Sequence, residues 1–163
     1  MKIRNFILLI IVIFICGFVL LSFLNWKKEV KYRLIMGSLM PKMEEAWVNL
    51  DYNIRNLENQ RFIEYCNTNQ TKFEEIVGLL NVLEVPKKYR NSHKYKVEGI
   101  VNLDKCNQDL CRMSKDRNYT YQKEDVQESI DICFKGIEDL ITSTKILESE
   151  SQNKSFFERI YTE

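Results

Sequence analysis

Apolar residues recur at three- and four-residue steps along most of the chain, which is the spacing of one face of an α-helix. This spacing covers residues 41–84, then continues after Pro86 to about residue 116 and again from about 124 to 148. No segment alternates apolar and polar residues as a half-buried strand does. The pattern therefore predicts an all-α chain. The apolar positions are Met43, Trp47, Leu50, Ile54, Leu57, Phe62, Tyr65, Cys66, Asn69, Phe73, Ile76, Val77, Leu80 and Leu83; then His93, Val97, Ile100, Leu103, Asn107, Leu110 and Cys111; then Val126, Ile130, Cys133, Ile137, Leu140, Ile141, Thr144 and Leu147.

Local signals suggest where these helices begin and end. Ser38 is an expected N-cap with Pro41 in the first turn. Residues 41–84 form one helix or two, and the polar run 67–71 is the expected break if there are two. The last two helices are matched at about 28 residues each, and short connections make them antiparallel neighbours. The sequence thus predicts an elongated up-down bundle of three or four long helices.

A separate apolar segment precedes the bundle. Residues 6–24 contain no charge, and a helix of that length spans about 29 Å, close to the hydrocarbon thickness of a bilayer. We therefore predict an N-terminal transmembrane anchor, with Trp26 at the interface. The expected domains are the anchor at 1–25, a juxtamembrane stalk at 26–40, the helical bundle at 41–150 and a C-terminal tail at 151–163.

A cleaved signal and a lipoprotein signal are the two alternatives to a retained anchor. A cleaved signal has a shorter apolar region followed by small residues, and no such site follows Leu24. A lipoprotein signal would be cut before Cys16, but the preceding Ile15 is bulky and eight apolar residues follow the cysteine before the chain becomes polar. Both features favour a helix that stays in the membrane.

The flanking charges do not fix the orientation of this helix. Lys2 and Arg4 precede it, whereas Lys27, Lys28, Lys31 and Arg33 follow it. The start of the chain has the order of charged and apolar regions of a secretory segment, and long domains are translocated largely regardless of charge. We expect the body to be extracytoplasmic.

Charge in the body is balanced. Without Lys2 and Arg4, the 24 basic residues become 22, against 23 acidic ones. A nucleic-acid-binding domain would present a basic face, so we expect no nucleic-acid partner.

No catalytic constellation is visible in the sequence. His93 is the only histidine, and catalysis or metal binding would need partners that the chain does not supply. Its place on the apolar face of a helix predicts a packed, hydrogen-bonded side chain. We therefore expect no catalytic residues, no cofactor and no metal site, and we expect that the protein is not an enzyme.

The body carries four cysteines, with no C-x-x-C pair. Cys66, Cys111 and Cys133 fall on apolar faces and are interpreted as small core residues. Cys106 and Cys111 lie on different faces of one helix and cannot readily bond to each other. In an oxidising compartment, a disulfide from Cys106 or Cys111 to Cys133 is the alternative interpretation.

Basic and aromatic residues are concentrated in residues 87–96. One interpretation is contact with anionic lipid headgroups or another polyanion; the other is a solvated first helical turn. Basic residues at a helix N-terminus oppose the helix dipole, which favours the first interpretation slightly. The residues of the expected polyanion contact are Lys87, Lys88, Arg90, Lys94 and Lys96.

The spacing of Pro86 and His93, followed by two antiparallel helices of equal length, resembles helical lipoproteins and membrane-anchored proteins of low-GC Gram-positive bacteria. The resemblance covers about residues 60–148 and rests on two residues. Such proteins generally have no assigned activity, so no catalytic role is implied, and Ile15 departs from their lipoprotein signal.

These observations favour a single-pass, membrane-anchored helical protein at the cell membrane. The first function hypothesis is an envelope interaction or structural module that binds another protein or a surface polymer without catalysis. The alternative is an extracytoplasmic ligand-sensing bundle, and no cytoplasmic signalling region supports it.

Overall fold

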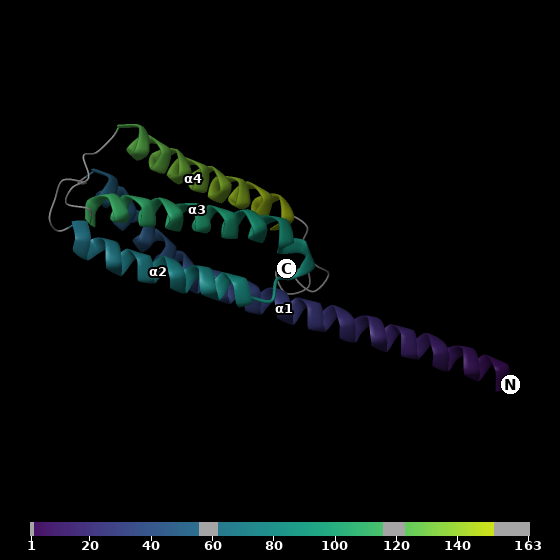
Figure 1. Cartoon of the computed structure of the whole chain (residues 1–163). Coiled ribbons are helices and arrows are strands. Elements are labelled where there is room, and N and C mark those ends of the chain that lie inside the picture. The colour runs from purple at the N-terminus through teal and green to yellow at the C-terminus, as the bar shows by residue number, and fades with distance from the viewer. Residues whose placement is uncertain (1, 56–61, 116–122, 152–163) are drawn as a thin grey trace.

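The computed structural model describes residues 2–55, 62–115 and 123–151, and these residues are almost entirely helical (Figure 1). No strand occurs among them, which confirms the predicted all-α class. The predicted tail at 151–163 lies outside the described residues beyond Ser151. The elements are α1 (Lys2–Arg55), α2 (Phe62–Val82), the short 3-10 helix η1 (Lys87–Tyr89), α3 (Arg90–Lys115) and α4 (Lys123–Ser151).

Helix α3 is the centre of the bundle. It packs against α2 on one side and along the length of α4 on the other, while α1 packs mainly against α2 (Figure 1). The helices alternate in direction, and α3 and α4 have 26 and 29 residues, close to the matched lengths expected from the sequence. The N-terminal half of α1 extends beyond the bundle.

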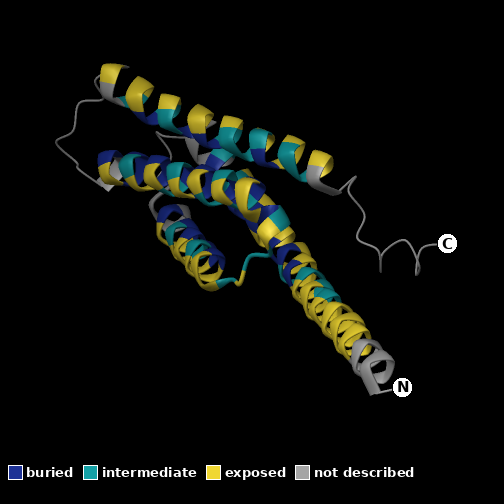
Figure 2. Cartoon of the chain, turned by 90° about the vertical axis from the view of Figure 1, so that its right-hand side faces the viewer, coloured by how far each residue is buried: buried dark blue, intermediate teal, exposed yellow. Residues whose placement is uncertain are grey.

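From Ile10 onward, this projecting part is exposed (Figure 2), and most of its side chains as far as Leu24 are apolar. Within Ile10–Asp51, α1 contains an 18-residue window of mean hydropathy 2.2, none of which is buried. Length and composition therefore make this helix able to cross a membrane. Cys16 is a free, exposed cysteine in this part of the helix.

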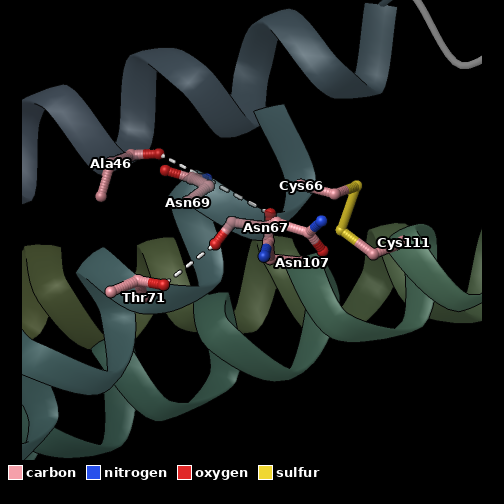
Figure 3. Close-up of a disulfide and its surroundings, with 7 residues drawn as sticks. All are labelled: Ala46, Cys66, Asn67, Asn69, Thr71, Asn107 and Cys111. Atoms are coloured by element: carbon pink, nitrogen blue, oxygen red, sulfur yellow. Dashed lines mark hydrogen bonds between the residues drawn. A yellow bond between two sulfur atoms is a disulfide. The ribbon is translucent and has the colours of Figure 1, made fainter. Parts of the chain in front are cut away.

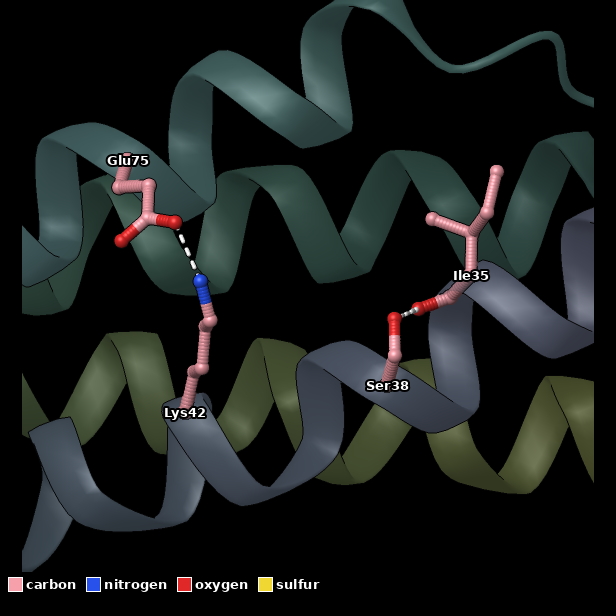
Figure 4. Close-up of polar contacts among 4 residues, drawn as sticks. All are labelled: Ile35, Ser38, Lys42 and Glu75. Carbon is pink, nitrogen blue, oxygen red and sulfur yellow. Dashed lines mark hydrogen bonds and ion pairs between the residues drawn. The ribbon is translucent and has the colours of Figure 1, made fainter.

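The predicted helix start at Ser38 and Pro41 is wrong. α1 continues through both residues, and the Ser38 hydroxyl donates a 2.7 Å hydrogen bond to the carbonyl oxygen of Ile35 instead of capping a new helix (Figure 4). An interior proline removes one backbone hydrogen bond and costs about 3 kcal/mol. The helix persists because residues on both sides of Pro41, such as Leu39 and Met43, are buried on the same face, and their burial offsets this cost.

This buried face begins earlier than the expected bundle boundary. Tyr32, Met36 and Leu39 are buried in the same core as Ala46 and Leu50. Residues 26–40 do extend the apolar helix outward, as expected of a stalk, but from Tyr32 onward they belong to the bundle. Beside them, Lys42 forms an ion pair with Glu75 of α2 (Figure 4).

The segment 41–84 contains two helices, and the predicted break at residues 67–71 is wrong. α2 runs through this stretch without interruption, and Thr71 bonds back to the carbonyl oxygen of Asn67 at 3.1 Å. Asn69 is fully buried and donates 3.2 Å hydrogen bonds to the Ala46 carbonyl and to Asn107 Oδ1 (Figure 3). Thr71 thus bonds within α2 and Asn69 bonds to α1 and α3, so these polar side chains are accommodated in a continuous helix.

Helices α3 and α4 approach so closely that glycines meet between them. A Cβ atom on Gly99 would lie 2.8 Å from the carbonyl oxygen of Gly136, and the reverse distance is also 2.8 Å. Leu140 covers Gly99, and Leu103 covers Gly136. Gly99 and Gly136 therefore form a site of close approach between the two helices.

Small residues also line the face of α4 that packs on α3, which changes part of the predicted pattern. Ser129, Gly136 and Ser143 are buried, whereas Ile141 and Thr144, predicted to point inward, are exposed. The Ser143 hydroxyl donates a 2.7 Å hydrogen bond to the Ser92 carbonyl. The apolar spacing located the helix correctly, but the short distance to α3 selects smaller side chains on the inner face.

All four cysteines of the body form disulfides. Cys66 of α2 is bonded to Cys111 of α3, and Cys106 of α3 is bonded to Cys133 of α4, with Cα–Cα distances of 5.6 and 5.5 Å (Figure 3 shows the first). The interpretation of Cys66, Cys111 and Cys133 as unbonded core residues is therefore wrong, although all three are buried. Of the expected alternatives, the Cys106–Cys133 bond is present.

Candidate functional site

The base of the bundle lies where α1 leaves its exposed apolar half. Here the connection between α2 and α3 returns to the side of α1 and is held by two ion pairs. Lys28 of α1 bonds to Glu84, and Lys88 of η1 lies 2.8 Å from a carboxylate oxygen of Glu29. These contacts place residues 84–91 at the same level as the first residues after the apolar run.

The electrostatics of the two pairs differ because their exposure differs. Lys28 and the nearby Lys31 hold the pKa of the solvent-exposed Glu84 below its usual range. Burial alone would lower the pKa of Lys88, but its contacts with Glu29 and Tyr89 outweigh burial and raise that pKa. The Lys88 ammonium also lies 4.9 Å from the ring centroid of Tyr89, a cation–π contact.

Aromatic rings also pack the connection between α2 and α3 against α1. Tyr32 stacks on Tyr89 with ring centroids 5.0 Å apart, and His93 meets Tyr32 edge-on at 5.7 Å. Tyr32 and Tyr89 are buried, so this contact also removes apolar ring surface from water. The base of α1 is thereby fixed to the start of α3.

His93 completes this cluster through both ring nitrogens. Its Nε2 lies 3.2 Å from the carbonyl oxygen of Leu80, which can only accept, and its Nδ1 lies 3.2 Å from the Tyr32 hydroxyl. The proton therefore belongs on Nε2, and Tyr32 donates to Nδ1. This neutral ring is the packed, hydrogen-bonded histidine that the sequence predicts.

Acidification should weaken this cluster. Burial lowers the pKa of His93, and the neighbouring charge of Lys96 lowers it further, while the bond to Leu80 acts in the opposite direction. The folded chain thus binds fewer protons than the unfolded chain, whose histidine pKa is about 6.5. The contribution of His93 to folding stability is therefore fully present above about pH 6.5. It is lost as the pH falls from there through the lower pKa of His93 in the folded chain.

The measurement is the melting temperature of the full chain in detergent between pH 7.5 and 5.5. We expect wild type to lose more stability over this range than His93→Gln, whose side chain stays neutral throughout. Parallel pH profiles of the two proteins would show that His93 does not carry the effect.

A cleft of about 700 Å³ opens beside these contacts. It lies between the first turns of α1 after the apolar run and the connection that leads into α3. Four basic and two acidic side chains contribute to its wall, so the lining carries a net charge of +2. The lining residues are Asn25, Lys28, Glu29, Glu84, Val85, Pro86, Lys87, Lys88, Arg90 and Asn91.

The structure divides the five residues of the expected polyanion contact. Lys87, Lys88 and Arg90 line the cleft, with Lys87 and Arg90 exposed. Lys94 is exposed but lies outside the lining and pairs with Glu98 at 3.8 Å. Lys96 is 8% exposed, and burial lowers its pKa, so it is not part of a solvated surface. The cleft also includes Asn91 from within this stretch, and it adds Asn25 and Lys28 of α1, which lie about 60 residues earlier in the chain.

Among the described residues, no group of three or more His, Cys, Asp or Glu side chains is arranged to hold a metal ion. The absence of catalysis and of a cofactor stays a prediction from the sequence. No protein-family model, curated protein or solved structure matches the chain.

Proposed function

We propose that the protein is a single-pass membrane module that holds a disulfide-braced helical body on the extracytoplasmic side, where it binds another protein or a surface polymer without catalysis. The observation that carries this proposal is the pairing of all four body cysteines. The two bonds, Cys66–Cys111 and Cys106–Cys133, join α2 to α3 and α3 to α4. Disulfides of this kind persist in oxidising compartments and are rare in the cytosol.

The continuity of α1 supports a mechanical role for the anchor. One helix, Lys2–Arg55, contains both the exposed apolar run and the buried residues Tyr32, Met36 and Leu39. The two ion pairs and the Tyr32–Tyr89 stack clamp the base of the body to this helix. The body is therefore held in a fixed direction relative to the membrane segment.

The charged surface supports an interaction role over catalysis. The two nitrogens of His93 are occupied by structural hydrogen bonds, and many acidic side chains, such as Glu45, Glu75 and Glu84, are exposed and paired with lysines. Each of these side chains is thus already bonded to another residue, and none is paired with a nucleophile that it could activate as a general base.

Protease accessibility tests the topology. With the full chain carrying a C-terminal epitope tag, protease added to intact spheroplasts should remove the body, while a cytoplasmic marker stays intact. A body that survives until the membrane is broken would contradict the extracytoplasmic placement. Crosslinking on whole cells, followed by capture through the tag, then identifies the partner.

A further inference from the structure

The basic cleft at the base of the bundle lies at the level of lipid headgroups if α1 is the membrane anchor. Leu24 ends the apolar run, and Asn25, Lys28 and Glu29 line the cleft directly after it. Glu29 is five residues beyond Leu24, at most about 8 Å along the helix axis. The headgroup region adds about 5–7 Å to each side of the hydrocarbon core. The wall of the cleft therefore starts inside the headgroup layer.

Two of the basic side chains in this wall are available for a ligand. Lys28 and Lys88 are engaged by Glu84 and Glu29, and these pairs neutralise both carboxylates of the lining. Lys87 and Arg90 are exposed and have no ion-pair partner among the described residues. The net charge of +2 in the cleft lining therefore comes from Lys87 and Arg90.

The backbone adds to the same positive potential. α3 begins at Arg90, directly after η1, and has no acidic residue in its first turn. Pro86 precedes η1 without a side-chain cap. Basic side chains at the positive end of a helix repel that end, and an anion bound there is attracted by both and so offsets the repulsion. The cleft combines this helix start with a guanidinium, which binds phosphate oxygens in bidentate fashion.

We propose that this cleft binds the phosphate-bearing headgroup of an anionic membrane lipid, with Lys87 and Arg90 as the main contacts and Asn25 and Asn91 as polar neighbours. The proposal rests on the retained anchor of the proposed function. The headgroup then fastens the base of the body to the bilayer surface.

The test measures thermal unfolding of the full chain in a zwitterionic detergent during titration with a short-chain phosphatidylglycerol. Wild type should be stabilised in a saturable way. The double variant Lys87→Gln/Arg90→Gln should need at least a tenfold higher lipid concentration for the same stabilisation. Lys135→Gln, an exposed lysine on α4, is the matched control and should behave as wild type. Circular dichroism checks that each variant folds, and single Arg90→Gln replaces the double variant if that one does not.

Three results would overturn the proposal. These are no stabilisation by phosphatidylglycerol, equal stabilisation of the double variant, or equal stabilisation by phosphatidylcholine at the same concentration. A parallel titration with inorganic phosphate separates the two sources of the anion, and stabilisation as strong as that by the lipid would assign the cleft to a soluble phosphate ligand. Failure of the topology itself appears in the protease experiment, which does not depend on lipid binding.

Discussion

Alanine at Gly99 or Gly136 is expected to lower the free energy of unfolding by about 1–3 kcal/mol, whereas alanine at Gly78 should raise it by about 0.5–1 kcal/mol. All three glycines lie inside helices, so each substitution gains the same helical propensity. Only their surroundings differ. A new Cβ on Gly78 meets nothing within 4 Å, but on Gly99 or Gly136 it meets a backbone oxygen at 2.8 Å.

The clash cannot be relieved by one side chain. A carbonyl oxygen in a helix moves only with its helix, so α3 and α4 must separate along their contact, and the packing of Leu103 and Leu140 is lost with it. Denaturant unfolding of the three single variants in detergent gives the comparison. An increase in stability at all three positions would contradict the close glycine contact. The double variant should cost less than the sum of the two single ones, because one alanine already separates the helices.

Loss of the disulfides should have a larger effect. The Cys66–Cys111 bond closes a loop of 45 residues and Cys106–Cys133 one of 27. Restriction of the unfolded chain by loops of this size stabilises the fold by about 4 and about 3.5 kcal/mol, respectively. We therefore expect Cys66→Ala/Cys111→Ala and Cys106→Ala/Cys133→Ala each to lower the stability of the body by several kcal/mol.

The two bonds brace different parts of the bundle, which makes the variants informative separately. The first holds α2 on α3 beside the buried Asn69–Asn107 pair, and the second holds α4 on α3. Far-UV circular dichroism during urea unfolding, with and without reductant, measures the loss. Cys16→Ser is the control and should unfold as wild type does, since Cys16 is free and lies outside the bundle. A reduced body that unfolds at the same urea concentration as the oxidised one would contradict the predicted stabilisation.

The helices were predictable from the sequence because their buried faces are periodic. The faces of α2 and α3, from Cys66 to Leu83 and from His93 to Cys111, fall where the apolar spacing predicts them. The continuation of α1 through Ser38 and Pro41 was not predictable from local rules. Ser38 and Pro41 give a strong local signal for a helix start, but burial of Tyr32, Met36 and Leu39 on one continuous face outweighs it.

The remaining features depend on contacts between helices, which spacing along one helix does not report. Cys66 gave no sign of a partner 45 residues away in Cys111. The sequence does contain one signal of this kind: Gly99–Leu103 and Gly136–Leu140 repeat the same four-residue spacing on neighbouring helices, as a reciprocal glycine contact requires. The cleft joins Lys28 to Lys87 and Arg90, which only the return of the connection between α2 and α3 brings together. The sequence located the basic stretch but not which of its residues share a surface, since Lys88 pairs with Glu29 and Lys96 is buried.

The central claim is that an intact anchor carries a disulfide-bonded body outside the reducing cytosol, and intact mass tests both halves at once. The chain is extracted from native membranes into denaturing detergent with an alkylating reagent and no reductant, and its mass is compared with that of a sample reduced first. We predict the mass of all 163 residues with one alkyl group, at Cys16, and five groups after reduction. A chain shortened at its N-terminus, or five alkyl groups without reduction, would contradict the account.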